Sequence, residues 1–449
     1  MIGRSQVQSR CWRVASRPDD ILDSWSFVPA GAMNGALNDL TGIAMTWTPL
    51  PATEWILIAL CCLSACYITV VALVRHGCAA PMMKGAVAAT PRPVSVLKPL
   101  CGFEPRLYAN LETFCEQTHP CFQLIFGVSS HRDPAVAVVE RLRVIYPDVD
   151  ITLVVDATLH GANHKVSNLI NMEQHARHDV FVMADSDIAV QPDYLVKVTA
   201  PLEQPSVGIV TCLYRARRVG NFWTRLGALF IDEWFVPSVY LAHATGSQRF
   251  GFGATLAMRR ETLDTIGGLA AVKNCVADDY SIAHEIRQLG LCTYLSEVVV
   301  STDVTERDFV SLWQRETRWL RTIRTVHPLG FAFILISFSS PWLLTSFILG
   351  LGDDANGGLS SAGMVDMLAD LCTSLGVSAR VLLHWRRARD WRAFLRDLPL
   401  IPLRDLLLWA EWVVAAFGSH VIWRGSRIRI DENAPGKNQP DGPEAFDRT

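Results

Sequence analysis

Two kinds of hydrophobic pattern divide this chain. Between residues 94 and 305, short apolar runs of strand length alternate with segments whose apolar residues recur at helical spacing. Before and after that region, the apolar runs are longer and carry little or no charge. The first pattern is typical of a sheet with intervening helices, and the second is typical of helices buried in protein or in a membrane.

The alternating region predicts five strands and three intervening helices. The predicted strands are residues 94–98, 124–129, 151–155, 180–184 and 208–212. The predicted helices are residues 107–117, 135–146 and 164–176. Because strands that alternate with helices usually pair in parallel, we predict an α/β fold with a doubly wound, mostly parallel sheet.

Residues 55–74 form an uncharged run of 20 residues. At about 1.5 Å per residue, a helix of this length spans a hydrocarbon core of about 30 Å, although a buried helix of a soluble protein shows the same pattern. The twenty residues before this run contain no Lys or Arg, whereas Arg75, His76, Lys84 and Arg92 follow it. By the positive-inside rule, we expect the region after the run to face the cytoplasm.

Three further apolar segments follow the alternating region. Residues 329–350 are uncharged, residues 363–383 are interrupted by Asp366, Asp370 and Arg380, and residues 406–423 contain Glu411. Two or three of these segments are expected to be membrane helices. The basic stretch between the last two suits anionic lipid headgroups; it contains Arg386, Arg387, Arg389, Arg392 and Arg396.

These patterns predict five parts of the chain. They are a disordered extension (1–50), a transmembrane helix (51–76), an α/β domain that ends in a basic helix (90–328), a C-terminal membrane region (329–425) and a polar tail (426–449). The extension is rich in Arg, Asp, Gly and Ser without periodicity, which is typical of disorder.

Composition argues against nucleic-acid binding and against a zinc site. The formal net charge is −3 and 19% of residues are charged, whereas a nucleic-acid binder normally has a strongly basic domain, so no nucleic-acid partner is expected. The 12 cysteines include no CxxC pair, which argues against a zinc site. We expect reduced thiols in a membrane protein that faces the cytosol.

Two carboxylates, Asp185 and Asp187, stand directly after the predicted strand 180–184. Ligands of open α/β sheets bind beyond the carboxyl ends of the strands. Two carboxylates at that edge repel each other, and Mg²⁺ or Mn²⁺ carrying a diphosphate would relieve the repulsion. A solvated turn is the alternative for this motif alone.

Other polar residues stand at strand ends or helix starts of the same region. Asp133 follows the second strand and could accept hydrogen bonds from a nucleotide, or it could cap the helix that starts at Pro134. Lys165 and Asn168 open a helix after a glycine-containing loop, a position that suits an anion.

Asp279 follows a glycine-rich approach that includes Gly253, and its carboxylate could act as a general base. The alternative is a charged helix start.

Arg315, Arg318 and Trp319 lie on one face of the basic helix, because they are three and four residues apart. The arginine fork matches phosphate oxygens, and the tryptophan offers a flat wall beside a sugar or at the membrane boundary. For Arg321 and Arg324 we expect contact with lipid phosphates.

Taken together, these residues resemble the ceramide glucosyltransferase-like family of membrane-bound glycosyltransferases with the GT-A fold. The resemblance covers residues 94–326 and is specific because the motifs occur in the family's order. They are residues 96–100, with Lys98 and Pro99, His131-Arg-Asp133-Pro134, Asp185-Ser-Asp187, Asp279-Tyr280 and Arg315-x-x-Arg318-Trp319.

The resemblance implies a role for each matching residue. Asp279 would be the general base, Arg315, Arg318 and Trp319 would hold the leaving diphosphate, and Asp185 and Asp187 would bind the metal. The UDP-sugar would contact Lys98, Pro99, Asp133, Lys165, Asn168, Asp185 and Gly253.

Within the family, the chain is most similar to bacterial hopanoid biosynthesis-associated glycosyltransferases, through residues 164–171, 226–235, 251–254 and 321–324. That similarity implies transfer of N-acetylglucosamine from its UDP derivative to bacteriohopanetetrol at a bacterial inner membrane, by a multi-pass protein. The alternative is transfer of glucose from UDP-glucose to ceramide. Eukaryotic ceramide enzymes have Asp-Ser-Gly where this chain has Asp185-Ser-Asp187, a departure that strengthens the metal site and weakens that kinship.

Three other classes are less compatible with the sequence. Processive polysaccharide synthases share the acidic motifs but usually have Gln at the position of Arg315 and more membrane spans. Phosphatases with an Asp-x-Asp nucleophile need Thr or Val where this chain has Ala189. A non-catalytic scaffold would need no ordered acidic series.

Overall fold

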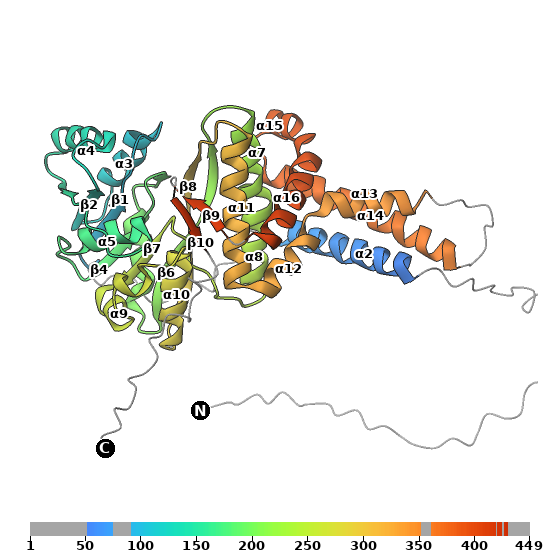
Figure 1. The fold of residues 1–449 in the computed structure, drawn as a ribbon, viewed down its shortest axis with the longest axis horizontal. Helices are drawn as coiled ribbons and strands as arrows, with labels where there is room; N and C mark the ends of the chain where they lie inside the picture. The colour runs from blue at the N-terminus through green and yellow to red at the C-terminus, as the bar shows by residue number, and fades with distance from the viewer. Residues whose placement is uncertain (1–51, 75–90, 352–360, 419, 424–425, 430–449) are drawn as a thin grey trace, which may run out of the picture.

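The computed structural model describes residues 52–74, 91–351, 361–418, 420–423 and 426–429. The predicted extension (1–50), the basic residues Arg75, His76 and Lys84, and most of the polar tail lie outside the described residues. A sheet with its helices forms one end of the molecule, and the helices α2, α13 and α14 project from the other end (Figure 1).

An eight-stranded sheet, in the order β3-β2-β1-β4-β7-β6-β8-β5, forms the centre of the α/β domain. Four of its seven neighbouring pairs are parallel, and β7 and β5 pair antiparallel to their neighbours. The strands are β1 (Val94–Pro99), β2 (Phe122–Val128), β3 (Asp150–Val155), β4 (Val180–Met183), β5 (Ile188–Ala189), β6 (Val207–Arg218), β7 (Leu256–Arg259) and β8 (Cys292–Val304).

The α/β prediction is confirmed, since each of the five predicted strands corresponds to an observed one. The observed sheet is mixed, because β7 enters it between β4 and β6 with the opposite direction. The helices and 3₁₀ or π turns of the domain are α3 (Leu107–Cys115), α4 (Pro134–Ile145), α5 (His164–Glu173), α6 (Tyr194–Thr199), η1 (Ala200–Glu203), α7 (Phe222–Phe230), η2 (Ile231–Phe235), α8 (Val236–Ala244), α9 (Arg260–Thr265), η3 (Leu269–Val272), α10 (Asp278–Gln288) and α11 (Phe309–Val326).

Helices cover both faces of the sheet, which explains why β1 is buried along its whole length. Val96 on β1 belongs to one core cluster, with Phe114 of α3. The next residue, Leu97, belongs to the cluster on the opposite face, with Leu169 of α5. Because side chains alternate along a strand, two buried faces require the nearly continuous apolar runs from which the strands are predicted.

The remaining helices form an arm and its connection to the α/β domain. They are α2 (Ala52–Leu73), α12 (Pro328–Ser337), α13 (Ser339–Leu349), α14 (Ser361–Arg387), α15 (Trp391–Asp397) and α16 (Leu400–Phe417), and a hairpin of β9 (His420–Trp423) and β10 (Ser426–Arg429) follows. In the arm, α2 packs against α13 and α14, and Cys62 Sγ lies 3.2 Å from Cys372 Sγ.

Residues 329–350, expected to form one span, form two helices, α12 and α13, which meet at a bend of 51°, the geometry of a broken span or a re-entrant loop. Pro341 explains the break, since its ring would clash with the carbonyl of Ser337 in a continuous helix. The carboxylate of Asp405 accepts hydrogen bonds from Ser340 N (3.0 Å) and Ser340 Oγ (2.6 Å) at the start of α13. Asp405 of α16 therefore satisfies one backbone donor of the new helix start.

Among the described residues, α2 is long and apolar enough to cross a membrane, and the bent α12–α13 pair is a second candidate. Residues 406–423 do not form one membrane helix: α16 ends at Phe417, residues 420–423 form β9, and α16 packs along α11 of the α/β domain. The helix buries Arg404, Asp405 and Glu411 against protein, which explains why an apolar segment there carries charge.

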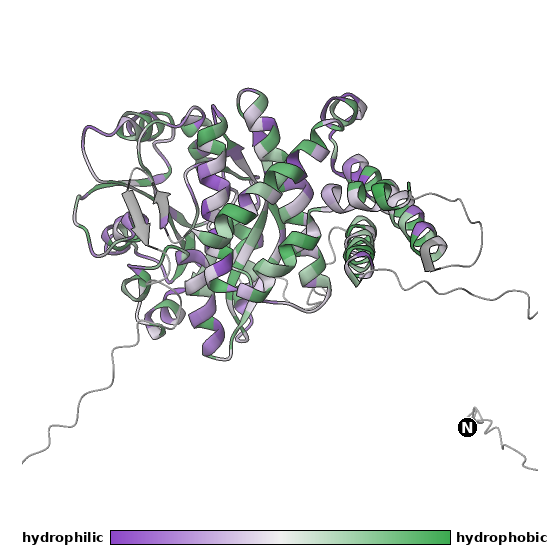
Figure 2. Ribbon diagram, turned by 45° about the vertical axis from the view of Figure 1, so that its right-hand side comes forward, coloured by the Kyte–Doolittle hydropathy of each residue, from purple (hydrophilic) through white to green (hydrophobic). Residues whose placement is uncertain are grey.

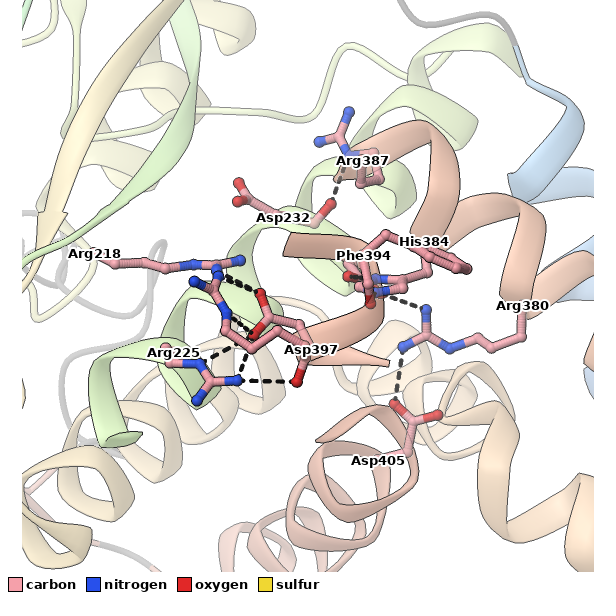
Figure 3. A network of polar contacts seen from close by, with 11 residues as sticks. Arg218, Arg225, Asp232, Arg380, His384, Arg387, Phe394, Asp397 and Asp405 are labelled. Atoms are coloured by element: carbon pink, nitrogen blue, oxygen red, sulfur yellow. Dashed lines mark hydrogen bonds and ion pairs between the residues drawn. The ribbon is translucent and has the colours of Figure 1, made fainter. Parts of the chain in front are cut away.

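Ion pairs attach the C-terminal helices to the α/β domain (Figure 3). Arg380 of α14 bonds to Glu233 Oε2 (2.7 Å) and Asp405 Oδ1 (3.4 Å), and His384 Nδ1 lies 2.5 Å from Glu233 Oε1. Asp397 of α15 accepts from Arg218 (2.5 Å) and Arg225 (2.6 Å).

Three arginines of the basic stretch predicted to suit lipid headgroups make protein contacts, and contact of this stretch with lipid stays a prediction. Arg386 bonds to the carbonyl of Ala72, Arg387 bonds to the carbonyl of Asp232 at 2.7 Å, and Arg396 pairs with Asp397 at 3.0 Å. These side chains satisfy carbonyl and carboxylate groups where the arm joins the domain.

Replacing Asp397 with Asn should destabilise the protein. Burial opposes the charge of Asp397, but hydrogen bonds from Arg396 and Arg225 hold its pKa well below the usual range. Removing one partner of a buried pair costs about 3–5 kcal/mol, so thermal unfolding of Asp397→Asn at pH 7 should begin at a clearly lower temperature.

The difference in stability between wild type and Asp397→Asn should depend on pH in one direction. Because the folded-state pKa is depressed, the stabilisation is complete above about pH 4, the ordinary range for Asp. It is lost as the pH falls further, so wild type and variant should converge in acid. Asp150→Asn, which breaks an exposed pair with Arg177, is the control and should change stability by at most about 1 kcal/mol. Equal melting temperatures of Asp397→Asn and wild type at pH 7 would contradict the expectation.

Candidate active site

Lys98, at the end of β1, fixes the loop after β4. Its side chain is fully buried, its Nζ donates to the carbonyl of Asp185 at 2.8 Å, and it lies 3.7 Å from the centre of the Phe114 ring. Burial lowers the pKa of Lys98 to about 7, although Asp187 and Asp185 oppose the shift. Lys98 thus holds the backbone of the loop after β4 in place. The neighbouring Pro99 lines a small cavity together with Lys165, Gly253 and Asp278.

Asp185 and Asp187 have different partners at the end of β4. Asp185 Oδ1 lies 2.7 Å from Lys165 Nζ, and Asp187 Oδ2 accepts from Thr302 Oγ1 at 2.9 Å. Burial and the neighbouring Asp185 raise the pKa of Asp187 to about 7. The two carboxylates therefore repel each other, as expected from their positions in the sequence.

The donor set fits a divalent metal only if other ligands complete it. In the described part of the chain, no group of three or more His, Cys, Asp or Glu side chains is arranged to hold a metal by itself. Asp185 and Asp187 supply hard carboxylate oxygens, which suit Mg²⁺ or Mn²⁺ bound by one or two carboxylates together with substrate phosphates. The residues present therefore fit a metal that arrives with a diphosphate.

Lys165 joins the loop after β4 to the start of α10. Its Nζ lies 3.4 Å from Asp278 Oδ2 as well as close to Asp185. Burial opposes the charge of Lys165, but Asp185 and Asp278 hold its pKa well above the usual value. Asn163 caps α5 through the amide of Val166 and donates to Asp278 at 3.3 Å, so the cap of α5 also fixes Asp278.

Asn168 points toward β2 rather than to these carboxylates. Its Nδ2 donates to the carbonyl of Gly127 at 2.8 Å, and its Oδ1 is a buried atom without a hydrogen-bond partner. The expected contact of Asn168 with a nucleotide sugar stays a prediction.

Asp279 and Asp185 lie on two sides of Gly253. Asp279 Oδ2 accepts from Gly253 N at 2.8 Å. A Cβ at Gly253 would lie 2.9 Å from Asp185 Oδ2 and 3.1 Å from Lys165 Nζ. A side chain there would displace these groups, which explains why a glycine stands at this point. Burial and Asp278 raise the pKa of Asp279 to about 6.

The helix α11 brings Arg318 close to the acidic cluster, defined as Asp185, Asp187, Asp278 and Asp279. Burial and Arg315 lower the pKa of Arg318, and Asp185 and Asp279 oppose that shift, so its guanidinium lies within the field of the cluster. Arg315 is held by Glu306 (2.6 Å) and Glu316 (3.1 Å).

Trp319 belongs to a group of packed aromatic rings. Its ring centre lies 5.4 Å from that of Phe230, 6.1 Å from Phe235 and 6.3 Å from Tyr214. The ring is half-buried in this group, so it forms part of a wall and does not stand alone.

Asp133 has two structural contacts. It caps α4 through Ala135 N at 2.9 Å, and it accepts from Gly102 N at 2.9 and 3.1 Å. Gly102 has a φ of 74°, a conformation that favours glycine. The helix-cap interpretation of Asp133 is confirmed, and its contact with a nucleotide stays a prediction.

Arg321 and Arg324 bind protein, so the expectation of lipid phosphate contact for them is wrong. Arg321 Nη1 donates to the carbonyl of His420 at 2.5 Å. Arg324 donates to the carbonyls of Ala415, Ala416 and Gly418, at 2.9, 2.5 and 2.6 Å. These carbonyls end α16, where a cation is favoured by the helix dipole.

Several residues near the acidic cluster have no local sequence signal. Thr302 on β8 binds Asp187, and Glu104 adds to the negative charge around Asp187. Burial and Asp279 raise the pKa of Tyr214 on β6 well above its usual value. Thr302 and Tyr214 come from strands far from the motifs in the sequence and reach this place through the strand order, whereas Glu104 lies in the loop directly after β1.

Comparison with known proteins gives one family for most of the chain. The sequence profile described as Glycosyl transferase family 21 matches residues 56–435. Two similar curated proteins are Ceramide glucosyltransferase 1 of Caenorhabditis elegans, 25% identical over 229 residues, and Ceramide glucosyltransferase 3 of the same organism, 27% identical over 232 residues. Each match covers 51% of this chain and 49% or 50% of the relative, so the chain spans about half the length of the curated relatives it matches.

Comparison with solved structures gives, among others, the mannosyltransferase PcManGT from Pyrobaculum calidifontis in complex with GDP-Man and Mn²⁺. It is 20% identical, with a TM-score of 0.44, over 80% of this chain and 99% of that chain.

Proposed function

Because the chain belongs to glycosyl transferase family 21, we propose that it transfers a hexose from a UDP-sugar to a hydroxyl group of a membrane lipid. The observation that carries this proposal is the convergence of Asp185, Lys165 and Asp279 around Gly253 at one edge of the sheet. Arg318 adds positive charge to the same place. Donor phosphates need cations and an acceptor hydroxyl needs a base, and this arrangement offers both.

The proposed reaction is a single displacement on a GT-A type domain. The acceptor oxygen forms a bond to the anomeric carbon, the bond from that carbon to the diphosphate breaks, and the acceptor proton passes to Asp279. Arg315 and Arg318 stabilise the charge on the leaving diphosphate. Asp185 and Asp187 would hold Mg²⁺ or Mn²⁺, which would neutralise the diphosphate. The configuration at the anomeric carbon is thereby inverted.

The relatives favour glucose and a ceramide-like lipid as donor sugar and acceptor. Both nematode proteins are named ceramide glucosyltransferases. Transfer of N-acetylglucosamine to bacteriohopanetetrol, the narrower expectation from the sequence, has no support among these relatives. We therefore propose UDP-glucose and a sphingolipid-type acceptor as the first substrates to test.

Membrane attachment through α2 fits a lipid acceptor. Its outer face exposes a row of large apolar side chains, Ile56, Leu63 and Val70, each about half exposed. Figure 2 shows the hydrophobic residues of the projecting helices. An apolar face of this kind marks a protein or membrane contact, and we propose that the arm is embedded in the membrane with the α/β domain on the cytoplasmic side.

A substrate panel tests the proposed function. Purified protein in lipid nanodiscs is incubated with UDP-glucose or UDP-N-acetylglucosamine and with ceramide or bacteriohopanetetrol, and products are analysed by mass spectrometry and NMR. We expect a β-linked glucosyl lipid from the α-linked donor. An α-linked product, or no transfer to any lipid hydroxyl, would exclude the mechanism.

Asp279→Asn should lower turnover by about 10²–10⁴-fold, the usual contribution of a positioned general base, while UDP binding persists. Because a base acts when deprotonated, the rate should fall as the pH drops below about 6, where Asp279 gains its proton. Asp278 raises the pKa of Asp279, so Asp278→Asn should reduce turnover far less and move this acidic limb to lower pH. An Asp279→Asn enzyme with most of its activity would rule out the assignment.

Chelation should abolish transfer, because the diphosphate and the two carboxylates of Asp185 and Asp187 repel one another without a cation. Asp187→Asn should raise the Mn²⁺ concentration needed for half-maximal rate and lower the maximal rate. Asp193→Asn, in an exposed pair with Lys197, is the control and should leave both unchanged. Full activity in excess EDTA is the result that would disprove metal dependence.

A further inference from the structure

An arginine buried between α16 and the α/β domain is connected to the diphosphate-binding motif. Arg404 is 1% exposed, and its Nη2 donates to Glu316 Oε2 at 2.5 Å and to Glu411 Oε2 at 2.9 Å. Neither glutamate is exposed to solvent. Burying ionisable groups is costly unless they are paired, so this cluster constrains where α16 can lie on α11.

Glu316 connects that cluster to Arg315, its neighbour in the sequence. The oxygen Oε2 of Glu316 accepts from Arg404, and the other oxygen, Oε1, accepts from Arg315 Nη2 at 3.1 Å. The carboxylate of Glu316 is therefore shared between Arg315 of the motif and Arg404, which lies 88 residues after Glu316. Glu306 pairs with the other terminal nitrogen of Arg315, Nη1, at 2.6 Å.

A second contact leads from Arg404 to Trp319. The Arg404 guanidinium lies 5.9 Å from the centre of the Phe230 ring, within the range of a cation–π interaction. The same ring lies 5.4 Å from the ring of Trp319. Arg404 therefore contacts the supports of both ends of the Arg315–Trp319 motif.

Attachment of α16 to α11 does not by itself require this arrangement. Arg324, further along α11, binds the carbonyls of Ala415, Ala416 and Gly418 at the end of α16. That contact joins the same two helices without touching Arg315 or Glu316. The pair of arginines thus offers a matched comparison between holding the helices together and holding the motif.

We propose that Arg404 is a positioning residue for sugar transfer: it fixes Glu316, and Glu316 aims Arg315 at the leaving diphosphate. This inference rests on the proposed function, in which Arg315 stabilises that diphosphate. Without Arg404, both oxygens of Glu316 are available to Arg315, and its guanidinium turns away from the substrate. Residues 400–417 are then part of the catalytic machinery as well as of the scaffold.

Arg404→Met tests the proposal in a double-mutant cycle with Arg315→Ala. In the full-length protein, Arg404→Met should lower kcat by about 10- to 100-fold, the loss typical of a misplaced group. In the Arg315→Ala background, the same substitution should change kcat by less than about twofold, because the group it positions is already absent. Independent, multiplicative losses would overturn the positioning role.

Two further variants guard against a purely structural effect. Arg324→Met should lower the melting temperature but keep kcat within about twofold of wild type; a loss as large as that of Arg404→Met would overturn the proposal. The triple variant Arg404→Met, Glu316→Leu, Glu411→Leu replaces the buried charges with apolar groups, which is often neutral for stability. It should stay folded with kcat as low as in Arg404→Met, and wild-type kcat would overturn the proposal.

The outcomes separate this proposal from the function on which it rests. If Arg315→Ala retains wild-type turnover, the role of Arg315 in the proposed function fails. If Arg315→Ala loses turnover and Arg404→Met does not, the function stands and the positioning role alone fails.

Discussion

The ammonium group of Lys165 holds two carboxylates together at one edge of the sheet, one from a loop and one from the start of a helix. Asp185 follows β4 and Asp278 begins α10, and neither could approach the other without a cation between them. The glycine at position 253 leaves the space in which this pairing occurs. Every proposed contact of the site depends on this arrangement, because it sets the distance between the carboxylate proposed to bind metal and the proposed base.

The same constraint, that buried charge must be paired, organises the other end of the molecule. Asp397, Glu233 and Asp405 each receive an arginine from another element, and together they attach α14, α15 and α16 to the α/β domain. Apolar packing alone would allow these helices to slide, whereas a charge–charge contact has a narrow optimal geometry. The C-terminal helices are therefore held in a defined position relative to α11, on which the arginine–tryptophan motif lies.

The sequence predicts the first half of the sheet better than the second. Strands β1 to β4 are short apolar runs between helices of clear periodicity, and both features are local. By contrast, β7 is four residues long and β8 shows no regular alternation of buried and exposed residues over its thirteen, so their place depends on partners far away in the chain. Asp185 and Asp187 are predictable as a site because they directly follow a strand, whereas Thr302 and Tyr214 reach the same edge only through the strand order.

The arginines of α11 show why a local sequence pattern does not predict the partner of a side chain. A basic residue every third position on a helix is compatible with lipid phosphates, with carbonyls or with carboxylates. Arg324 donates to carbonyls at the end of α16, more than ninety residues later in the sequence. Arg315 pairs with Glu306, which precedes it by nine residues. The spacing gives the helix face, but the partner is decided by the tertiary fold.

The packing of α2 against α14 has a consequence for synthesis. Cys62 and Cys372, which touch in the arm, are separated by 310 residues, so at about 5–20 residues per second the partner helix emerges about 15 to 60 s after α2. During that interval the proposed membrane helix has to persist alone in lipid. The face of α2 that later packs against α14 consists of small or apolar residues such as Cys61, Ala65 and Ile68, and carries no charge. A helix of that composition is stable in the bilayer before α14 has been synthesised.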